Sequence, residues 1–439
     1  CVIGDGELII RDLVMVLDKN SWAYEEMEAI TGLCFLDESE QFHFTGYSHN
    51  LPADAIEMPD YSLLEIEGAD PYNGITDEPR WFKPYGIEIP EEMRGKKHAI
   101  IWTAAGCVAR CTFCHRWEKG YRVRPMDQLL DHIQHLTDKY NVGFLSMGDE
   151  TFGSDRRHTT ELVPHLGEMG FIWRAGGVRA RTVDLETLQF WKDNGCRMVI
   201  YGIESGSQTM LDVMEKKTTV QMNLDAIKWT HEAGLSTVVQ LVIGMPGETD
   251  QTIRETIEFL KDCVPHLHIF GGLPGGSISI NYAQALPGTP LYEYAREYGV
   301  IGKTIDEEEK YLTKISDTDA YAMDHFVNYT EQPMLKVMTW VYRISGELDA
   351  DYIHDTIGIK LSVPQVMISI LLTTIRHFSG KIFPKLRMII KTPLDHAAGK
   401  YLKGGAQDHG GYFNVRGPGA FSLFFFPGIR RWSYPIVAL

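Results

Sequence analysis

The sequence predicts an α/β fold in which six successive strand–helix units form a parallel sheet with helices outside it. Short apolar runs alternate with longer segments whose apolar residues repeat every three or four positions. Glycine stands immediately before three of the later runs, at Gly170, Gly195 and Gly234, where a left-handed residue typically ends a helix. Strands that alternate with helices pair in parallel through right-handed crossovers.

The elements are expected in regular order. The predicted strands cover residues 97–103, 142–147, 171–174, 197–201, 236–243 and 278–284. The predicted helices cover 126–140, a segment through Leu162 to Gly170, 184–194, 207–215, 220–233, 252–263 and 290–298. The first helix has a continuous apolar stripe of Met126, Leu129, Leu130, Ile133, Leu136 and Tyr140. Beyond residue 302 the chain is expected to be mainly helical, with a buried helix over 361–378.

Composition and charge exclude several classes of protein. The 439 residues include 42 basic and 59 acidic side chains, a net charge of −17, which argues against an extended nucleic-acid surface. No run of 18 apolar residues is present, so we expect no transmembrane segment. From Arg376 onward, however, ten basic residues accompany only two acidic ones. This basic tail, 376–439, predicts either a solvated face or peripheral contact with anionic lipid headgroups.

Three of the seven cysteines, Cys107, Cys111 and Cys114, lie within eight residues. A C-x3-C-x2-C spacing arises by chance in roughly two such chains per thousand. Structural zinc prefers four protein ligands, usually in two separated pairs, and no second pair follows here. Three thiolates suit a 4Fe–4S cluster that keeps one iron open for a small-molecule ligand. A zinc site and inert buried thiols are the alternatives.

With Phe113 in the aromatic position of C-x3-C-x-aromatic-C, this loop resembles the signature of the radical SAM superfamily. The resemblance implies a (β/α)6 partial TIM-like barrel and a 4Fe–4S cluster whose open iron binds S-adenosylmethionine. It further implies reductive cleavage of that molecule to a 5′-deoxyadenosyl radical, which abstracts a hydrogen atom. Phe113 would shield the cluster from water.

Further motifs of the family follow at strand ends, where βα barrels build their sites. After the second strand, Gly148, Asp149 and Glu150 occupy the position of the family's Gly-Gly-Glu motif, which holds the ammonium of S-adenosylmethionine. Here Asp149 replaces the second glycine. A capped turn without a ligand is the alternative for these three residues.

Two more strand ends carry cofactor candidates. After the fourth strand, Glu204 is expected to bond a ribose hydroxyl or the methionine ammonium, with Ser205 and Ser207 capping the next helix. After the fifth strand, a loop that allows close approach to the adenine contains Gly244, Gly247 and Glu248.

The substrate side is less clearly marked. Arg179 follows the third strand, and His115, Trp117 and Tyr121 lie just beyond the cysteine loop. All four are candidates to face the substrate, although ordinary packing explains such residues as well. No catalytic residue is assigned beyond the cluster ligands.

The strings GIESGS, GMPGET and ALPGTPLYEYA resemble the branch of the superfamily with an N-terminal cobalamin-binding domain. Residues 1–64 are then expected to be the C-terminal remnant of that Rossmann-like domain, 65–96 a connector, 97–300 the core barrel, and 301–439 a helical region with the basic tail. The cobalamin-binding motif D-x-H-x-x-G is absent from the sequence. We therefore expect cobalamin only in a longer, full-length form, and a degenerate domain is the alternative.

These features predict a cytoplasmic radical SAM enzyme that methylates or rearranges an unactivated carbon in a small metabolite, lipid or natural product. Its expected partners are that substrate and a low-potential electron donor such as flavodoxin or ferredoxin, without nucleic acid. One alternative is a methylthiotransferase-like RNA-modifying enzyme, but such relatives usually carry further N-terminal cysteines and a basic module. A non-catalytic iron–sulfur protein that only binds or passes electrons is the other.

Overall fold

A computed structural model describes residues 1–19, 24–48, 51–55, 58, 61, 75–76, 79, 86–115, 120–269, 274–316 and 326–358. Its main sheet has the strand order β11-β10-β9-β8-β7-β4-β3. The strands are β3 (Ile75–Thr76), β4 (Lys97–Ile101), β7 (Val142–Met147), β8 (Ile172–Val178), β9 (Cys196–Glu204), β10 (Ser236–Ile243) and β11 (Ile278–Tyr282). Every pairing from β4 to β11 is parallel, and only edge strand β3 is antiparallel. The predicted six-stranded half-barrel is confirmed.

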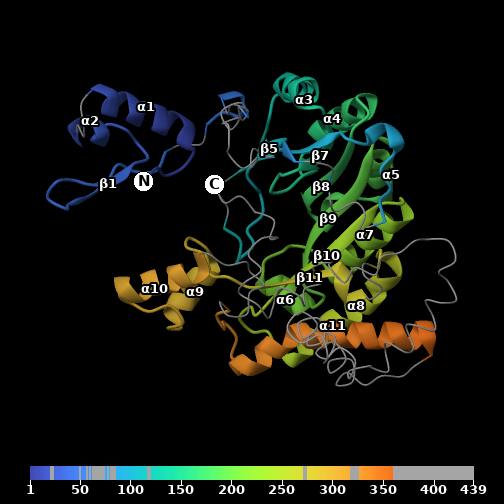
Figure 1. The fold of residues 1–439 in the computed structure, drawn as a ribbon. Helices are drawn as coiled ribbons and strands as arrows, with labels where there is room; N and C mark the ends of the chain where they lie inside the picture. Colours follow the sequence, from blue (N-terminus) through green and yellow to red (C-terminus); the bar gives the residue numbers. More distant parts are fainter. Residues whose placement is uncertain are drawn as a thin grey trace, which may run out of the picture.

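Helices cover one side of this sheet (Figure 1). They are α3 (Met126–Tyr140), α4 (Arg156–Glu168), α5 (Leu185–Asp193), α7 (Val220–Glu232) and α8 (Asp250–Cys263). Two further helices, α6 (Gln208–Val213) and α9 (Pro290–Glu297), contribute to a separate hydrophobic cluster. Asp155, Asp184 and Thr249 cap the N-termini of α4, α5 and α8 with their side chains. Gly170, Gly195 and Gly234 have φ values of 73°, 93° and 70°, so the predicted left-handed turns into the next strands are confirmed.

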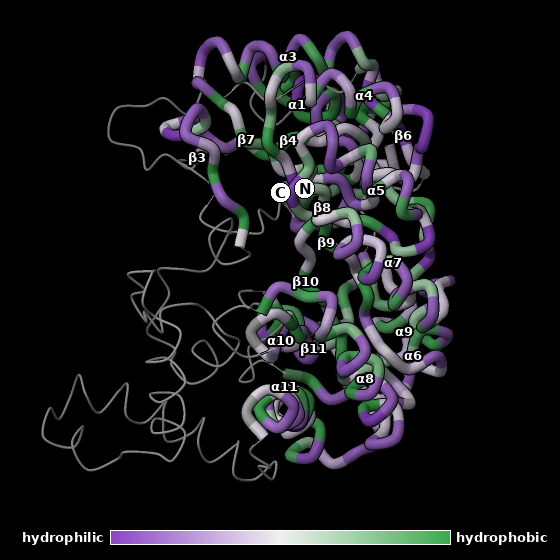
Figure 2. The backbone as a smooth tube through the Cα atoms, turned by 90° about the vertical axis from the view of Figure 1, so that its right-hand side faces the viewer, coloured by the Kyte–Doolittle hydropathy of each residue, from purple (hydrophilic) through white to green (hydrophobic). Residues whose placement is uncertain are grey.

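Two of the hydrophobic clusters lie on the two faces of the sheet. The larger cluster joins the convex face to the helices, and its strand residues include Leu145, Trp173 and Val239. A smaller cluster lies on the concave face and consists of Met93, Phe144, Ile172, Met198 and Val238. Hydrophobic residues gather in the strands, whereas α3 alternates hydrophobic and hydrophilic turns (Figure 2). This is the pattern of a helix with one face against a sheet.

The N-terminal part forms a separate small cluster of elements. Helices α1 (Gly6–Lys19) and α2 (Tyr24–Glu28) pack beside a hairpin of β1 (Cys34–Leu36) and β2 (Phe42–Phe44). The strand expected before α1 is reduced to one antiparallel bridge between Val2 and Leu33. The hairpin was not anticipated, because its strands are only three residues long. An ion pair of 3.2 Å between Asp5 and Arg122 links this part to the barrel.

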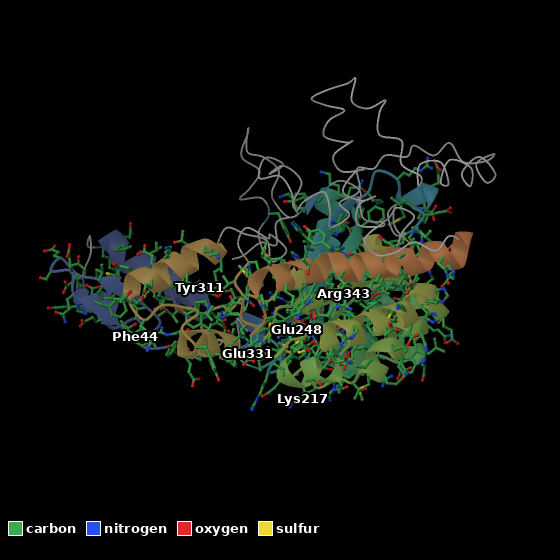
Figure 3. The ribbon with its side chains drawn as sticks, turned by 90° about the horizontal axis from the view of Figure 1, so that it is seen from below. Phe44, Lys217, Glu248, Tyr311, Glu331 and Arg343 are labelled. Atoms are coloured by element: carbon green, nitrogen blue, oxygen red, sulfur yellow. The ribbon has the colours of Figure 1, made fainter. Side chains whose placement is uncertain are left out.

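Two helices follow the barrel, α10 (Ile305–Ser316) and α11 (Met334–Ile357). Helix α11 packs against α8 and carries Arg343, which lies well away from Phe44 in the hairpin (Figure 3). The short 3-10 helices are Ala53–Ala55, Glu91–Met93, Ala180–Thr182, Val264–His266 and Pro274–Ser277. Within the described ranges no helix is long and apolar enough to cross a membrane. The helix expected over 361–378 and the basic tail lie outside the described residues.

Candidate functional site

The cysteine loop follows β4 at the carboxyl end of the sheet, between the short paired strands β5 (Ala104–Ala105) and β6 (Arg122–Val123). Two hydrogen bonds attach it to distant elements. The Thr112 N–H donates to the Met214 carbonyl (3.0 Å), and the Leu291 N–H donates to the Thr112 carbonyl (2.9 Å). The end of α6 and the start of α9 therefore hold the loop in place.

The three predicted cluster ligands lie in this one loop. Cys107 and Cys111 are buried and Cys114 is exposed. Partial desolvation raises the pKa of the Cys114 thiol to about 11, and the thiols of Cys111 and Cys107 and the Glu150 carboxylate contribute to the rise. The environment of Cys114 therefore includes both other cysteines and Glu150.

Among the described residues, no set of three or more His, Cys, Asp or Glu side chains that could hold a metal ion is found. Thiolates that hold a 4Fe–4S cluster bind different iron atoms and need not share one metal position. A guanidinium nitrogen of Arg179 lies 3.9 Å from the Cys111 sulfur, where it would oppose the charge of a thiolate. Arg179 is thus next to Cys111, and it is buried.

Phe113 and its neighbours form the apolar side of the loop. Phe113 is half-buried and packs on a cluster that includes Met210, Met245 and Leu291. The side chain of His115 lies 3.0 Å from the Pro287 carbonyl, to which a ring N–H donates. His115 is therefore attached to the turn before α9. Trp117 lies outside the described residues.

Asp149 is buried and supports the backbone that leads into the cysteine loop. Its carboxylate accepts hydrogen bonds from the N–H of Thr103 (2.6 Å), from the Thr103 hydroxyl (2.5 Å) and from the N–H of Ala104 (3.3 Å). Burial raises its pKa to about 6, although these bonds counteract the rise. Burial and the nearby Asp149 charge also raise the pKa of Tyr121, which places this phenol in the same region.

Gly148 and Glu150, on either side of Asp149, have different surroundings. A Cβ on Gly148 would lie 2.8 Å from the Trp102 indole nitrogen, so only glycine fits here without a shift of that ring. Glu150 is half-buried, and its charge reaches Cys114. Of the two motif carboxylates, Glu150 thus affects the Cys114 thiol, whereas Asp149 bonds to the backbone before the loop.

Glu204 ends β9 with a positive φ of 65° and forms an ion pair that the sequence did not indicate. The Lys216 ammonium lies 2.7 Å from the Glu204 carboxylate, and both side chains are nearly buried, at 9% and 12% exposure. Arg179 donates to the backbone carbonyl of Lys216. The sequence contains two adjacent lysines, Lys216 and Lys217, after a short apolar helix, but it does not reveal which of them faces inward.

The serines after Glu204 stabilise the loop. Ser205 is buried, and its hydroxyl accepts the Ser207 N–H (3.1 Å). Ser207 is the N-cap residue of α6, but its hydroxyl donates to Glu255 and makes no cap bond. The prediction of a Ser207 side-chain cap is therefore wrong, because the adjacent α8 offers a charged acceptor.

The loop after β10 is held by a hydrogen bond between two of its own residues. Glu248 is buried and accepts a hydrogen bond from the Gly244 N–H, while burial raises its pKa to about 8. Gly244 and Gly247 have φ values of 87° and 78°, and Gly247 is exposed with no atom near its missing Cβ. Figure 3 shows Glu248 in the interior and Lys217 at the outer edge. The open backbone at Gly247 is consistent with close approach of a ligand.

Comparison with known proteins agrees with the resemblance that the sequence motifs indicate. Residues 103–260 match the model of the Radical SAM superfamily. The anaerobic magnesium-protoporphyrin IX monomethyl ester cyclase of Cereibacter sphaeroides is 28% identical over 274 residues, 61% of this chain and 41% of that protein. An uncharacterized methyltransferase of Pyrococcus horikoshii is 26% identical over 304 residues, 67% of this chain and 57% of that protein. The chain thus spans about half the length of these curated relatives.

Among solved structures, the cobalamin-dependent S-adenosylmethionine radical enzyme OxsB, with aqua-cobalamin and S-adenosylmethionine bound, has a similar fold. The TM-score is 0.52 at 15% identity, over 91% of this chain and 58% of that one. Residues 103–260, which contain the three clustered cysteines, are thus similar to the Radical SAM superfamily.

Proposed function

We propose that the protein cleaves S-adenosylmethionine reductively and uses the resulting radical on an unactivated carbon of a small molecule, with methyl transfer as the reaction class. The observation that carries this proposal is the group of Cys107, Cys111 and Cys114 at the carboxyl end of the half-barrel, next to the Glu204–Lys216 ion pair. The similarity to a methyltransferase of Pyrococcus horikoshii supports methyl transfer.

When bound, a 4Fe–4S cluster supplies the electron that divides S-adenosylmethionine into methionine and a 5′-deoxyadenosyl radical. The chain contributes the three thiolates that hold it. Arg179, next to Cys111, offsets part of the thiolate charge, and Phe113 excludes water on the side of α9.

The charged groups beside the cysteines match the methionine part of S-adenosylmethionine. That part carries an ammonium and a carboxylate, and the site offers Glu150 and Glu204 for the first and Lys216 for the second. The Glu204–Lys216 pair holds both groups in position before the ligand arrives, which reduces the entropy lost on binding. Backbone groups near Gly244 and Gly247 are available to the adenine.

The residues present do not fit cobalamin. Its binding motif D-x-H-x-x-G is absent, and residues 1–48 provide two helices and one antiparallel hairpin instead of a parallel sheet edge. We propose cobalamin binding only for a longer form of the chain.

The electron donor is proposed to be flavodoxin or ferredoxin in the cytoplasm, and the basic tail is proposed to make any peripheral membrane contact.

The test is anaerobic. The protein is reconstituted with iron and sulfide, given dithionite and S-adenosylmethionine, and assayed for 5′-deoxyadenosine by mass spectrometry. A Cys107→Ala/Cys111→Ala/Cys114→Ala variant is the control. We expect product only from the wild type. A wild-type protein with a full cluster and no product would contradict the proposal and favour a non-catalytic iron–sulfur protein.

A further inference from the structure

Residues 1–3 lie beside strand β1 as a short antiparallel partner, at the N-terminus marked in Figure 1. Val2 bridges Leu33 in this pairing. One residue away, Cys1 and Cys34 exchange two hydrogen bonds. The Cys1 N–H donates to the Cys34 carbonyl (2.7 Å), and the Cys34 N–H donates to the Cys1 carbonyl (3.0 Å). The two cysteines are therefore directly opposite each other.

Opposite positions of this kind suit a disulfide. Residues that exchange both hydrogen bonds have Cα atoms about 5.5 Å apart and side chains on the same face, with Cβ atoms about 4.5–5.5 Å apart. A disulfide needs Cα atoms about 4.4–6.8 Å apart and Cβ atoms about 3.5–4.5 Å apart. The backbone spacing is met, and the side chains need to approach only slightly. Because that approach strains the bond, the disulfide is easily reduced.

The face that carries both thiols is open to small reagents. Cys1 is exposed and Cys34 is half-buried. Side chains alternate along β1, and Leu33 and Phe35 pack on the other side, in the apolar cluster shared with α1 and α2. Cys34 lies on the outer side together with Phe44, its register partner in β2, whose side chain is 47% exposed. A small disulfide molecule can therefore reach this pair.

We propose that Cys1 and Cys34 are a redox-sensitive site, which forms a reversible disulfide with each other when low-molecular-weight disulfides accumulate. One cysteine thiolate attacks a sulfur of glutathione disulfide and releases one glutathione thiolate. The other cysteine thiolate attacks the resulting mixed disulfide and releases the second glutathione. The two protein thiols lose two electrons and two protons in total, and the glutathione disulfide gains them.

The disulfide restrains a segment that contacts the barrel. Asp5, four residues after Cys1, accepts the Leu51 N–H (2.5 Å) and pairs with Arg122 (3.2 Å). Arg122 belongs to β6, one of the two short strands that flank the cysteine loop. Oxidation of the pair therefore holds the residues before this contact against the hairpin. The disulfide forms with or without a cluster, so it is independent of the proposed function.

Peptide mapping after treatment with glutathione tests the site. The full wild-type chain is equilibrated anaerobically with glutathione disulfide and glutathione, its free thiols are blocked with N-ethylmaleimide, and it is digested with trypsin. Cleavage after Arg11, Lys19 and Arg80 places the two cysteines in peptides 1–11 and 20–80. We expect these peptides to be linked, at least tenfold in excess over chains with a glutathione on each cysteine, because opposed thiols react at a high effective concentration. Dithiothreitol should reverse the link.

The Cys107→Ala/Cys111→Ala/Cys114→Ala variant removes the thiols of the cysteine loop as competitors. Its other two cysteines besides the pair, Cys196 and Cys263, are buried. This variant should give the same link as the wild type. Circular dichroism establishes that it is folded.

Two further variants are matched controls. Cys34→Ser leaves one thiol of the pair, which should carry a single glutathione. Cys34→Ser/Leu36→Cys keeps two thiols, because Leu36 is exposed on the same face, but it moves the second thiol about 7 Å along the strand. This variant should carry two glutathiones and little link. Linked wild type should also be cut by protease within residues 1–48 severalfold more slowly than reduced wild type.

A glutathione on each cysteine of the wild type, without a link between them, would overturn the proposal. Equal linkage in Cys34→Ser/Leu36→Cys would also overturn it, since flexible segments instead of opposed positions would then bring the thiols together. A link that leaves proteolysis of residues 1–48 unchanged would contradict the restraint of this segment. None of these results depends on formation of 5′-deoxyadenosine, so failure here and failure of the proposed function are separate outcomes.

Discussion

Near the cysteines, two adjacent lysines differ in burial, and we expect them to differ in function for that reason. Lys216 and Lys217 are neighbours, yet Lys216 is buried against Glu204 and Lys217 is exposed. Removing one partner of a buried ion pair costs about 3–5 kcal/mol because the other charge is left without compensation. We therefore expect substitution of Lys216, but not of Lys217, to affect the site.

The first prediction compares these two lysines. Lys216→Met should raise the S-adenosylmethionine concentration needed for half-maximal cleavage at least tenfold, because the methionine carboxylate loses its cation. Lys217→Met should leave it unchanged. Quantified 5′-deoxyadenosine over a range of S-adenosylmethionine concentrations measures both. Equal effects of the two substitutions would show that Lys216 has no special contact with the ligand.

The second prediction concerns Glu248 and pH. Burial raises its pKa from the ordinary value of 4.5 to about 8, so the folded state favours the protonated acid. Ionisation therefore costs stability progressively as the pH rises from about 4.5 to 8. Glu248→Gln keeps an acceptor for the Gly244 N–H and cannot ionise. Its melting temperature should exceed that of the wild type by a few degrees at pH 8, with a smaller gain at pH 6, and calorimetry at both pH values checks this. The same gain at both values would exclude ionisation as the cause.

At the level of elements, helix α11 is attached to the barrel through the first turn of α8. Asp250 accepts the Trp340 indole N–H (2.9 Å) and pairs with Lys336 (2.7 Å). The Trp340 ring is buried, so its N–H depends on this acceptor. Further along, Asp349 of α11 accepts the Gly275 N–H just before β11. Helix α11 thus supports the last strand of the sheet.

The third prediction follows from this attachment. Asp250→Ala should destabilise the protein by about 1–3 kcal/mol, since it leaves a buried indole N–H without an acceptor. Limited proteolysis should cut within α11 earlier than in the wild type. Asp225→Ala removes a half-buried carboxylate of α7 that bonds to the Gln221 side chain on the same helix; it is the control and should behave like the wild type. Resistance of α11 to proteolysis in Asp250→Ala would mean that apolar packing alone holds this helix.

The elements also differ in how well the sequence predicts them. Residues 142–147 and 236–243 were predicted as strands with the bounds that the structure has. Both are mainly apolar runs between helices with three- and four-residue periodicity, so local pattern and tertiary burial agree. The β1–β2 hairpin and the β5–β6 pair were missed. Their strands are two or three residues long, too short for a periodic signal.

At the level of the whole molecule, the cysteine loop joins parts of the chain that are far apart. Thr112 bonds to the end of α6 and to the start of α9, so a cluster held by the loop stabilises all three segments together. The fourth prediction is that reconstitution with iron and sulfide raises the melting temperature by several degrees, and that a chelator reverses this. The triple cysteine variant should show no rise. A rise in that variant would indicate iron binding elsewhere.

The fifth prediction concerns cobalamin. Because the described part of residues 1–48 provides no parallel sheet edge, and the sequence contains no D-x-H-x-x-G motif, the 439-residue chain should not retain hydroxocobalamin on gel filtration. The absorbance of the protein peak at the cobalamin bands measures retention. Stoichiometric retention would contradict this and would point to a binding mode that uses other residues.

The sequence by itself determined the half-barrel, the cysteine loop and the order of the polar motifs, because periodicity and ligand spacing are local properties. Tertiary structure alone decided which charges act together. Lys216 meets Glu204 only because the chain returns after α6, and Arg174 bonds to Ser146 only because β7 and β8 are neighbours in one sheet. It also decided that Asp149 and Glu248 bond to the backbone of their own loops. Such contacts depend on packing between segments, which no local pattern of residues encodes.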